Sequence, residues 1–133
     1  MTKIVYNILL ADDDLEDIEL LNETFGNHTS FNIVGNLQNG QQIVDYLSHN
    51  ELPDILLTDL YMPICTAFEA LDQIASVRNV YALKIIIFST NILPEYYEKL
   101  EAFDHIDFYQ KPPTIREFSE LPNRILAAIV HPS

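Results

Sequence analysis

Residues 54–59 read DILLTD, a short apolar run that ends on the carboxylate of Asp59. Residues 8–14 (ILLADDD) and 85–89 (IIIFS) follow the same plan, an uninterrupted apolar run and then a polar side chain. Apolar runs that do not alternate with polar residues are typical of strands covered on both faces, as in a parallel sheet. The sequence therefore predicts five strands, at about residues 4–10, 31–34, 55–57, 85–88 and 108–109, of which the second and fifth have the weaker pattern.

The segments between these runs have the apolar spacing of helices, with a hydrophobic residue at every third or fourth position. The residues that carry this spacing are Leu15, Ile18, Leu21 and Phe25, then Ile43, Val44 and Leu47, then Phe68, Leu71 and Ile74, and then Tyr96, Tyr97, Leu100 and Phe103. A fifth helical segment is expected near the end of the chain, where Thr114 and Glu117 fit a capping box. Pro122 follows inside it, and an interior proline costs a helix about 3 kcal/mol. We expect this helix to kink there or to begin near Leu121. Five strands alternating with five helices predict an α/β protein, a three-layer sandwich with a parallel sheet.

Length and composition restrict the function further. The 133 residues suit one domain with a single core, and 48% of them are hydrophobic. A formal net charge of −13 argues against nucleic acid and anionic membranes as partners. The single cysteine, Cys65, cannot form an intramolecular disulfide, and we expect it to be an inert thiol in a loop or at a helix start. The sequence has no signal-peptide pattern and no apolar run of roughly 20 residues, so we expect a soluble cytoplasmic protein.

Polar residues at the ends of the predicted strands are the candidates for chemistry, because ligands of an open parallel sheet bind beyond its carboxyl ends. These residues are Asp12, Asp13 and Asp14, then Asp59, then Ser89 and Thr90, and finally Lys111. Carboxylates within about 4 Å repel each other by on the order of 4 kcal/mol per pair, so such a cluster needs a cation, and its hard oxygens suit Mg²⁺. Asp59 could then attack phosphorus, with Lys111 and Ser89 binding the phosphoryl oxygens. Asp14 is the best candidate of the acidic run for a helix N-cap.

Four segments in this order resemble the motifs of the two-component response regulator receiver domain. They are residues 8–14, 56–63 (LLTDLYMP), 86–89 (IIFS) and 108–112 (FYQKP), so the resemblance covers essentially the whole chain. It implies a flavodoxin-like sandwich with strand order 2-1-3-4-5, as one stand-alone receiver domain over residues 1–133. It also implies a cis peptide bond between Lys111 and Pro112.

The resemblance assigns roles to residues of this chain. Asp12 and Asp13 become the metal-binding pair for Mg²⁺, joined by Asp59 and the backbone carbonyl of Tyr61. Asp59 is the implied phosphoacceptor. Lys111 is the implied phosphate contact, Ser89 the switch hydroxyl and Phe108 the switch aromatic residue.

The implied function is phosphorelay signal transduction. A sensor histidine kinase or a histidine phosphotransfer protein would donate the phosphoryl group. A surface at about residues 94–130 would then change and bind a downstream protein of unknown identity. We expect no enzymatic turnover beyond the protein's own phosphorylation and dephosphorylation, and neither nucleic acid nor membrane as a partner.

Three other functions are consistent with parts of the sequence. A degenerate receiver would use the same fold as a protein-binding module that does not depend on phosphorylation. A hydrolase of the haloacid dehalogenase type would need a second Asp two residues after Asp59, where this chain has Tyr61. A flavodoxin-like flavin binder would place a phosphate against residues 12–14, whose carboxylates would repel it. The sequence also departs from the family at Ala67, where a loop glycine is usual, and at Thr90, where Ala or Gly is usual.

Overall fold

The fold is built on one parallel sheet, and the computed structural model describes residues 5–76, 83–102 and 106–130 of the chain. The sheet order is β2-β1-β3-β4-β5, and every neighbouring pair is parallel. The strands are β1 (Tyr6–Ala11), β2 (Phe31–Leu37), β3 (Ile55–Thr58), β4 (Lys84–Ser89) and β5 (Ile106–Gln110). The predicted strands and the predicted order are confirmed.

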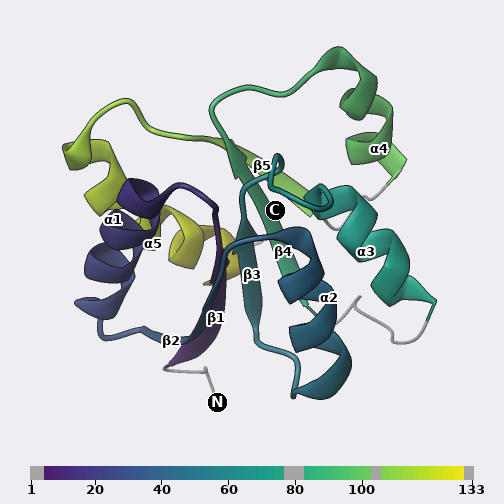
Figure 1. Ribbon diagram of the computed structural model, residues 1–133. Helices are drawn as coiled ribbons and strands as arrows, with labels where there is room; N and C mark the ends of the chain where they lie inside the picture. The colour runs from purple at the N-terminus through teal and green to yellow at the C-terminus, as the bar shows by residue number, and fades with distance from the viewer. Residues whose placement is uncertain (1–4, 77–82, 103–105, 131–133) are drawn as a thin grey trace.

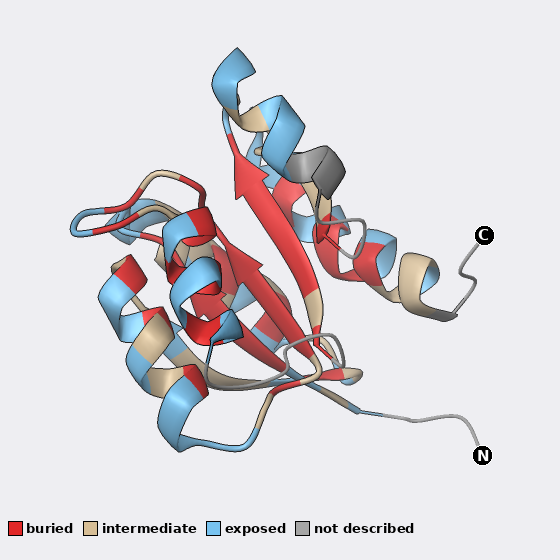
Figure 2. Ribbon diagram, turned by 90° about the vertical axis from the view of Figure 1, so that its right-hand side faces the viewer, coloured by how far each residue is buried: buried red, intermediate tan, exposed pale blue. Residues whose placement is uncertain are grey.

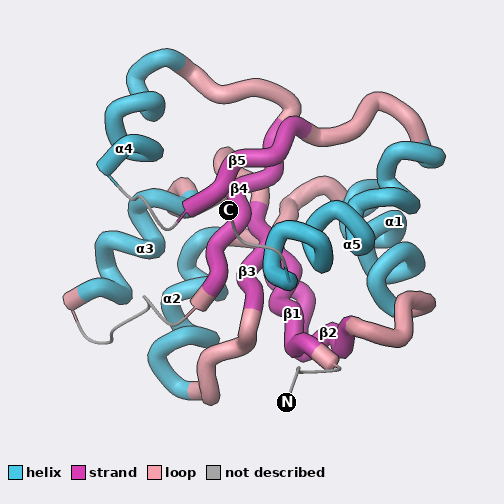
Figure 3. The backbone as a smooth tube through the Cα atoms, turned by 180° about the vertical axis from the view of Figure 1, so that it is seen from behind, coloured by secondary structure: helices cyan, strands magenta, loops and turns pink. Residues whose placement is uncertain are grey.

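Helices cover both faces of this sheet. They are α1 (Leu15–Gly26), α2 (Gly40–His49), α3 (Ala67–Ala75), α4 (Tyr97–Ala102), which continues from the short 3₁₀ helix η1 (Pro94–Tyr96), and α5 (Ile115–Val130). The helices α1 and α5 lie on one face, and α2 and α3 lie on the other (Figures 1 and 3). The three-layer sandwich is therefore confirmed. Within the described ranges, no helix is both long enough and apolar enough to span a membrane.

The sheet separates two hydrophobic cores, which explains why its strands are apolar at consecutive positions. In β1, Ile8 and Leu10 pack with Phe25 of α1 in one core, whereas Leu9 packs with Leu47 of α2 in the other. All three β1 side chains are fully buried. Figure 2 shows the central strands buried throughout and the helices buried along one stripe. Because both faces are covered, alternation with polar residues is absent from these strands.

The last helix begins at Ile115 and runs through Pro122, so the predicted alternative of a start near Leu121 is wrong. Thr114 caps its first turn and so provides half of the predicted capping box, because its hydroxyl accepts the backbone N–H of Glu117 at 3.2 Å. Leu121 and Ile125 are fully buried against the sheet and α1. Burial of such side chains contributes about 1.5–3 kcal/mol each, which offsets the roughly 3 kcal/mol cost of an interior proline. Of the predicted helical positions, Phe103 lies outside the described residues.

Candidate functional site

The polar residues predicted to converge do so at the carboxyl edge of the sheet. Asp12 follows β1, Asp59 follows β3, Ser89 ends β4 and Lys111 follows β5. Backbone hydrogen bonds fix three of them relative to neighbouring strands. Asp12 N donates to the Leu37 carbonyl at 2.9 Å, Asp59 N to Ala11 O at 2.9 Å, and Lys111 N to Ser89 O at 2.8 Å. The side chains of the site thus start from a rigid frame.

Three carboxylates form a cluster at this edge. Asp12, Asp13 and Asp59 each place one oxygen so that the three oxygens lie within 4.8 Å of one another. Asp12 and Asp59 are buried, and Asp13 is exposed. Carboxylates this close repel each other unless a cation lies between them. Mg²⁺ binds hard oxygen ligands and keeps several of its waters, which suits a cluster with one exposed member. The residues present therefore fit a divalent cation.

Lys111 supplies the positive charge of the site. Its Nζ lies 2.8 Å from Asp12 Oδ2, 2.7 Å from Asp17 Oδ2 and 3.8 Å from Asp59 Oδ1. The contact with Asp12 is an ion pair without a well-aligned hydrogen bond, whereas the contact with Asp17 is also a hydrogen bond. The lysine side chain is only 12% exposed. The ammonium is thus held between β1 and α1 and stays out of hydrogen-bond distance of Asp59.

Asp17 was missed by the sequence analysis. It lies in the first turn of α1, three residues after the N-cap Asp14, whose side chain accepts the backbone N–H groups of Glu16 and Asp17. An acidic residue in a first turn is ordinarily a partner of the helix dipole, so its type and position gave no separate signal. Only the folded chain brings it to Lys111. The prediction that Asp14 is the N-cap is confirmed.

Burial and the charges in the site change the acidity of its groups. Burial raises the pKa of Asp59 to about 6, with Lys111 opposing the rise and Asp12 adding to it. Burial also raises the pKa of Asp12, although Lys111 acts against it. Burial alone would lower the pKa of Lys111, but its close contacts with Asp12 and Asp17 and the charge of Asp59 outweigh it and raise that pKa. The lysine therefore stays charged, and Asp59 is mainly ionised at neutral pH.

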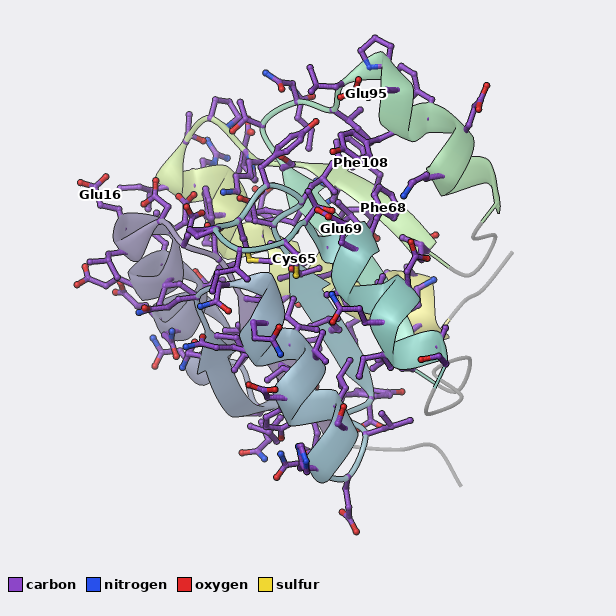
Figure 4. The ribbon with its side chains drawn as sticks, turned by 45° about the vertical axis from the view of Figure 1, so that its right-hand side comes forward. Glu16, Cys65, Phe68, Glu69, Glu95 and Phe108 are labelled. Atoms are coloured by element: carbon purple, nitrogen blue, oxygen red, sulfur yellow. The ribbon has the colours of Figure 1, made fainter. Side chains whose placement is uncertain are left out.

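The two residues with predicted switch roles lie in different surroundings. Ser89 is buried, and its hydroxyl acts to lower the pKa of the Asp59 carboxyl group. Phe108, of β5, is half-buried and packs on the core that α2 and α3 cover. Figure 4 shows it on the same side of the sheet as Phe68 of α3. Ser89 therefore acts on the Asp59 carboxylate itself, whereas Phe108 packs against the core beside α3.

Tyr61, whose backbone carbonyl is the fourth predicted metal ligand, also connects β3 to the segment before α4. Its hydroxyl accepts the backbone N–H of Leu93 at 2.8 Å. Its ring meets the Tyr96 ring edge-on, with 5.7 Å between centroids, and Tyr96 stacks on Phe68. Side-chain contacts thus run from the residue two positions after Asp59 to η1 and α3.

The loop between β3 and α3 has a conformation that the sequence analysis did not predict. Ile64 has a φ of +76°, in the left-handed region, and it is 73% exposed. Thr66 and Glu69 then form a complete capping box at the start of α3. The sequence pattern of a threonine followed three residues later by glutamate would have revealed this box. Ala67 is therefore an ordinary first helical residue, and the unusual backbone lies at Ile64.

The predicted cis bond between Lys111 and Pro112 is wrong, because no cis peptide bond occurs among the described residues. The trans form is favoured by about 0.5–1 kcal/mol even before proline, so packing must select the cis form. Here the hydrogen bond from Lys111 N to Ser89 O and the ion pairs of Lys111 form with a trans bond.

Comparison with known proteins assigns the family. The sequence pattern of the response regulator receiver domain matches residues 8–122. Transcriptional regulatory protein YdfI of Bacillus subtilis is 38% identical over 86 residues, which cover 62% of this chain and 37% of that protein. A protein-glutamate methylesterase/protein-glutamine glutaminase of Methanococcoides burtonii is 25% identical over 91% of this chain and 34% of its own length. The chain thus spans about a third of these curated relatives.

Solved structures agree with the fold. The phosphorylated cyanobacterial phytochrome response regulator RcpA matches with a TM-score of 0.77 and 20% identity, covering 97% of this chain and 96% of its own. The response regulator domain of Thermotoga maritima CheB matches with a TM-score of 0.76 and 23% identity, covering 97% and 99%. With the flavodoxin-like strand order, the acidic cluster and a family match over most of its length, this chain belongs to the response regulator receiver domain family.

Proposed function

We propose that Asp59 accepts a phosphoryl group from a sensor histidine kinase or a histidine phosphotransfer protein, in a Mg²⁺-dependent reaction. The observation that supports this most is the position of its carboxylate. Asp59 follows β3, and its carboxylate lies in a cluster with Asp12 and Asp13, has its pKa lowered by Ser89 and lies 3.8 Å from the Lys111 ammonium.

The reaction transfers one group. A carboxylate oxygen of Asp59 attacks the phosphorus of a phosphohistidine, a P–O bond forms, the P–N bond breaks, and the electron pair leaves with the imidazole nitrogen. Asp59 is the nucleophile only when ionised, which its pKa of about 6 allows at neutral pH. Lys111 and Ser89 bind the phosphoryl oxygens and stabilise their charge. Asp12, Asp13, Asp59 and the Tyr61 carbonyl would hold the cation, which neutralises the incoming negative charge.

The output is a change of surface rather than a turnover reaction. We propose that phosphorylation moves Ser89 and Phe108 and alters the surface over residues 94–130, which then binds a downstream protein. We further propose that residues 1–133 act as one receiver domain in the cytoplasm, with no catalysis beyond the chain's own phosphorylation and dephosphorylation. The net charge of −13 supports proteins, rather than nucleic acid or membrane, as the partners.

Acetyl phosphate with Mg²⁺, followed by intact-mass measurement, tests this proposal. The wild type should gain one phosphoryl group, Asp59→Asn should gain none, and Asp45→Asn, an exposed carboxylate on α2, should behave as wild type. Equal labelling of the wild type and Asp59→Asn would contradict the assignment. A wild type that never gains a phosphoryl group would instead indicate a degenerate receiver that binds proteins independently of phosphorylation.

A further inference from the structure

Asp17 has no part in the function proposed above, yet it makes the shortest contact of the Lys111 ammonium, 2.7 Å from its own Oδ2 to Nζ. Its side chain is 20% exposed, so the pair is largely shielded from water. The first turn of α1 is itself fixed, because the backbone N–H of Asp17 donates to Asp14 Oδ1 at 3.2 Å. Charge-assisted hydrogen bonds of this kind are the strong ones in proteins.

The Lys111 ammonium contacts two carboxylates closely and lies farther from the third. Its two close partners are Asp12, at 2.8 Å, and Asp17, while Asp59 Oδ1 is 3.8 Å away. A phosphoryl group on Asp59 needs the same ammonium for its oxygens. A cation held by Asp12 would weaken the hold of that carboxylate on Lys111, but Asp17 is outside the acidic cluster and would retain its contact with the ammonium. Asp17 is therefore the anion that competes with the phosphoryl group for Lys111.

We infer that Asp17 is a positioning residue that holds Lys111 on the α1 side of the site and so weakens the binding of a phosphoryl group at Asp59. The inference rests on the proposed phosphoacceptor function and concerns how strongly the phosphorylated state is favoured. Replacing Asp17 with a neutral residue removes a competitor for the ammonium and a negative charge near the incoming anion. Both effects favour the phosphorylated state.

Asp14 offers a matched control that separates the general effect of charge from the specific loss of the contact with Lys111. Asp14 belongs to the same helix start and carries the same charge, and its side chain caps α1. Asparagine caps a helix about as well as aspartate, so Asp14→Asn removes one charge and keeps the helix start. Among the ion pairs of Lys111 that the described residues form, none involves Asp14. Asp14→Asn therefore measures the general effect of charge, and Asp17→Asn adds the specific loss of the lysine contact.

The test is the affinity for beryllofluoride, a phosphoryl analogue, in saturating Mg²⁺, followed by tyrosine fluorescence or amide NMR. Asp17→Asn should bind it about tenfold more tightly than the wild type, which corresponds to about 1.4 kcal/mol. Asp14→Asn should change the affinity much less, and Asp17→Glu, which restores the charge, should return toward the wild type. A wild type that binds beryllofluoride while Asp17→Asn binds no more tightly than Asp14→Asn would overturn the inference alone. A wild type that neither binds beryllofluoride nor accepts phosphate would overturn the proposed function itself.

A second measurement tests the resting contact without any phosphoryl group. In metal-free protein, Asp17→Asn should lower the urea midpoint of unfolding, and it should lower it much less when Lys111 is already replaced by Met. This double-mutant cycle isolates the coupling between the two side chains. Equal shifts in both backgrounds would mean that the pair does not form in solution, and would contradict the inference.

Discussion

The chemistry of this site depends on one residue, Asp59, whose carboxyl group is buried. Its surroundings raise its pKa to about 6, chiefly through burial, and so disfavour the charge that a nucleophile needs. Lys111 opposes this effect from 3.8 Å, but its close contacts are with Asp12 and Asp17. A cation in the acidic cluster would lower the pKa of Asp59 again, because it stabilises the ionised carboxylate directly.

Mg²⁺ binding should therefore depend on pH. Protonated Asp59 cannot serve as a ligand, so the stabilisation by Mg²⁺ should be large at about pH 8 and small at about pH 5, below the Asp59 pKa. In metal-free protein the raised pKa acts in the opposite sense. The folded state holds the proton more tightly than the unfolded state, so this group makes stability fall as pH rises from about 4 to about 6.

Thermal unfolding with and without Mg²⁺ measures both effects. At ten times the dissociation constant, the ion should add about 1.4 kcal/mol to the free energy of unfolding at the higher pH. Asp13→Ala should lose most of this gain at little cost to the metal-free protein, since Asp13 is exposed. A gain that is the same at both pH values, or the same in Asp13→Ala, would contradict the metal site.

Tyr61 should lengthen the life of the phosphorylated state. Tyr61 lies two residues after Asp59, and its side chain is held by the hydrogen bond that its hydroxyl accepts from Leu93 N and by the contact with the Tyr96 ring. We expect the ring to restrict the approach of water to the acyl phosphate. Tyr61→Asn should speed phosphoryl decay by on the order of tenfold, within the roughly 10²-fold range of such positioning effects. Tyr61→Phe keeps the ring and should decay much as the wild type does. Decay in Tyr61→Asn that is no faster than wild type would show that the ring does not exclude water.

At the scale of the elements, the β3–α3 loop contains a backbone conformation that is unfavourable for its residue type, and among the described residues Ile64 alone has it. Ile64 is β-branched and has a φ of +76°, where an L-residue costs roughly 1–2 kcal/mol. Its side chain is 73% exposed, so little burial would be lost by removing it. Ile64→Gly should raise the free energy of unfolding by about 0.5–1 kcal/mol, after part of the gain is offset by the freedom of glycine in the unfolded chain. Ile64→Ala keeps a Cβ and should give no comparable gain in a urea titration. A stabilisation by alanine equal to that by glycine would mean that backbone strain is not the cause.

The start of α2 packs directly on the same loop. A Cβ added at Gly40 would overlap both Sγ and the carbonyl oxygen of Cys65, which is buried as a free thiol. Gly40→Ala should therefore lower the free energy of unfolding by about 1–3 kcal/mol, the usual cost of overpacking. Gly26→Ala is the control, because its Cβ would meet nothing nearer than Ile33 Cδ1 at 3.8 Å. Equal stability of the two variants by urea unfolding would contradict the close approach.

The elements also show which local features a sequence reveals. The central strands were predicted well because both of their faces are buried, so their residues are apolar without interruption. The start near Leu121, one of the two alternatives for α5, was wrong because the cost of Pro122 is local, whereas the burial of Leu121 and Ile125 that offsets it depends on α1 and the sheet. The φ of Ile64 had no signal at all, since isoleucine is rarely found in that conformation.

On the scale of the whole molecule, the parallel direction of the strands determines where the site lies. The five parallel strands all end at one edge, so residues from four of them that are far apart in the sequence meet there, and the predicted convergence of Asp12, Asp59, Ser89 and Lys111 is what the structure has. The position of Asp17 was not predictable, because its contact with Lys111 depends on how α1 packs on the sheet and on α5. The isomer of the bond before Pro112 was also missed, since the two isomers differ intrinsically by only about 0.5–1 kcal/mol and tertiary packing decides between them.

The central claim is that Asp59 carries the phosphoryl group, and locating the modified residue tests it most directly. Protein treated with acetyl phosphate and Mg²⁺ is reduced with borohydride, which converts an aspartyl phosphate to homoserine, and is then mapped by peptide mass spectrometry. We predict that the homoserine occurs at position 59 alone, and that it disappears when Mg²⁺ is removed. Homoserine at Asp12, Asp13 or Asp17, or a modified Asp59 that forms equally well without Mg²⁺, would contradict the account.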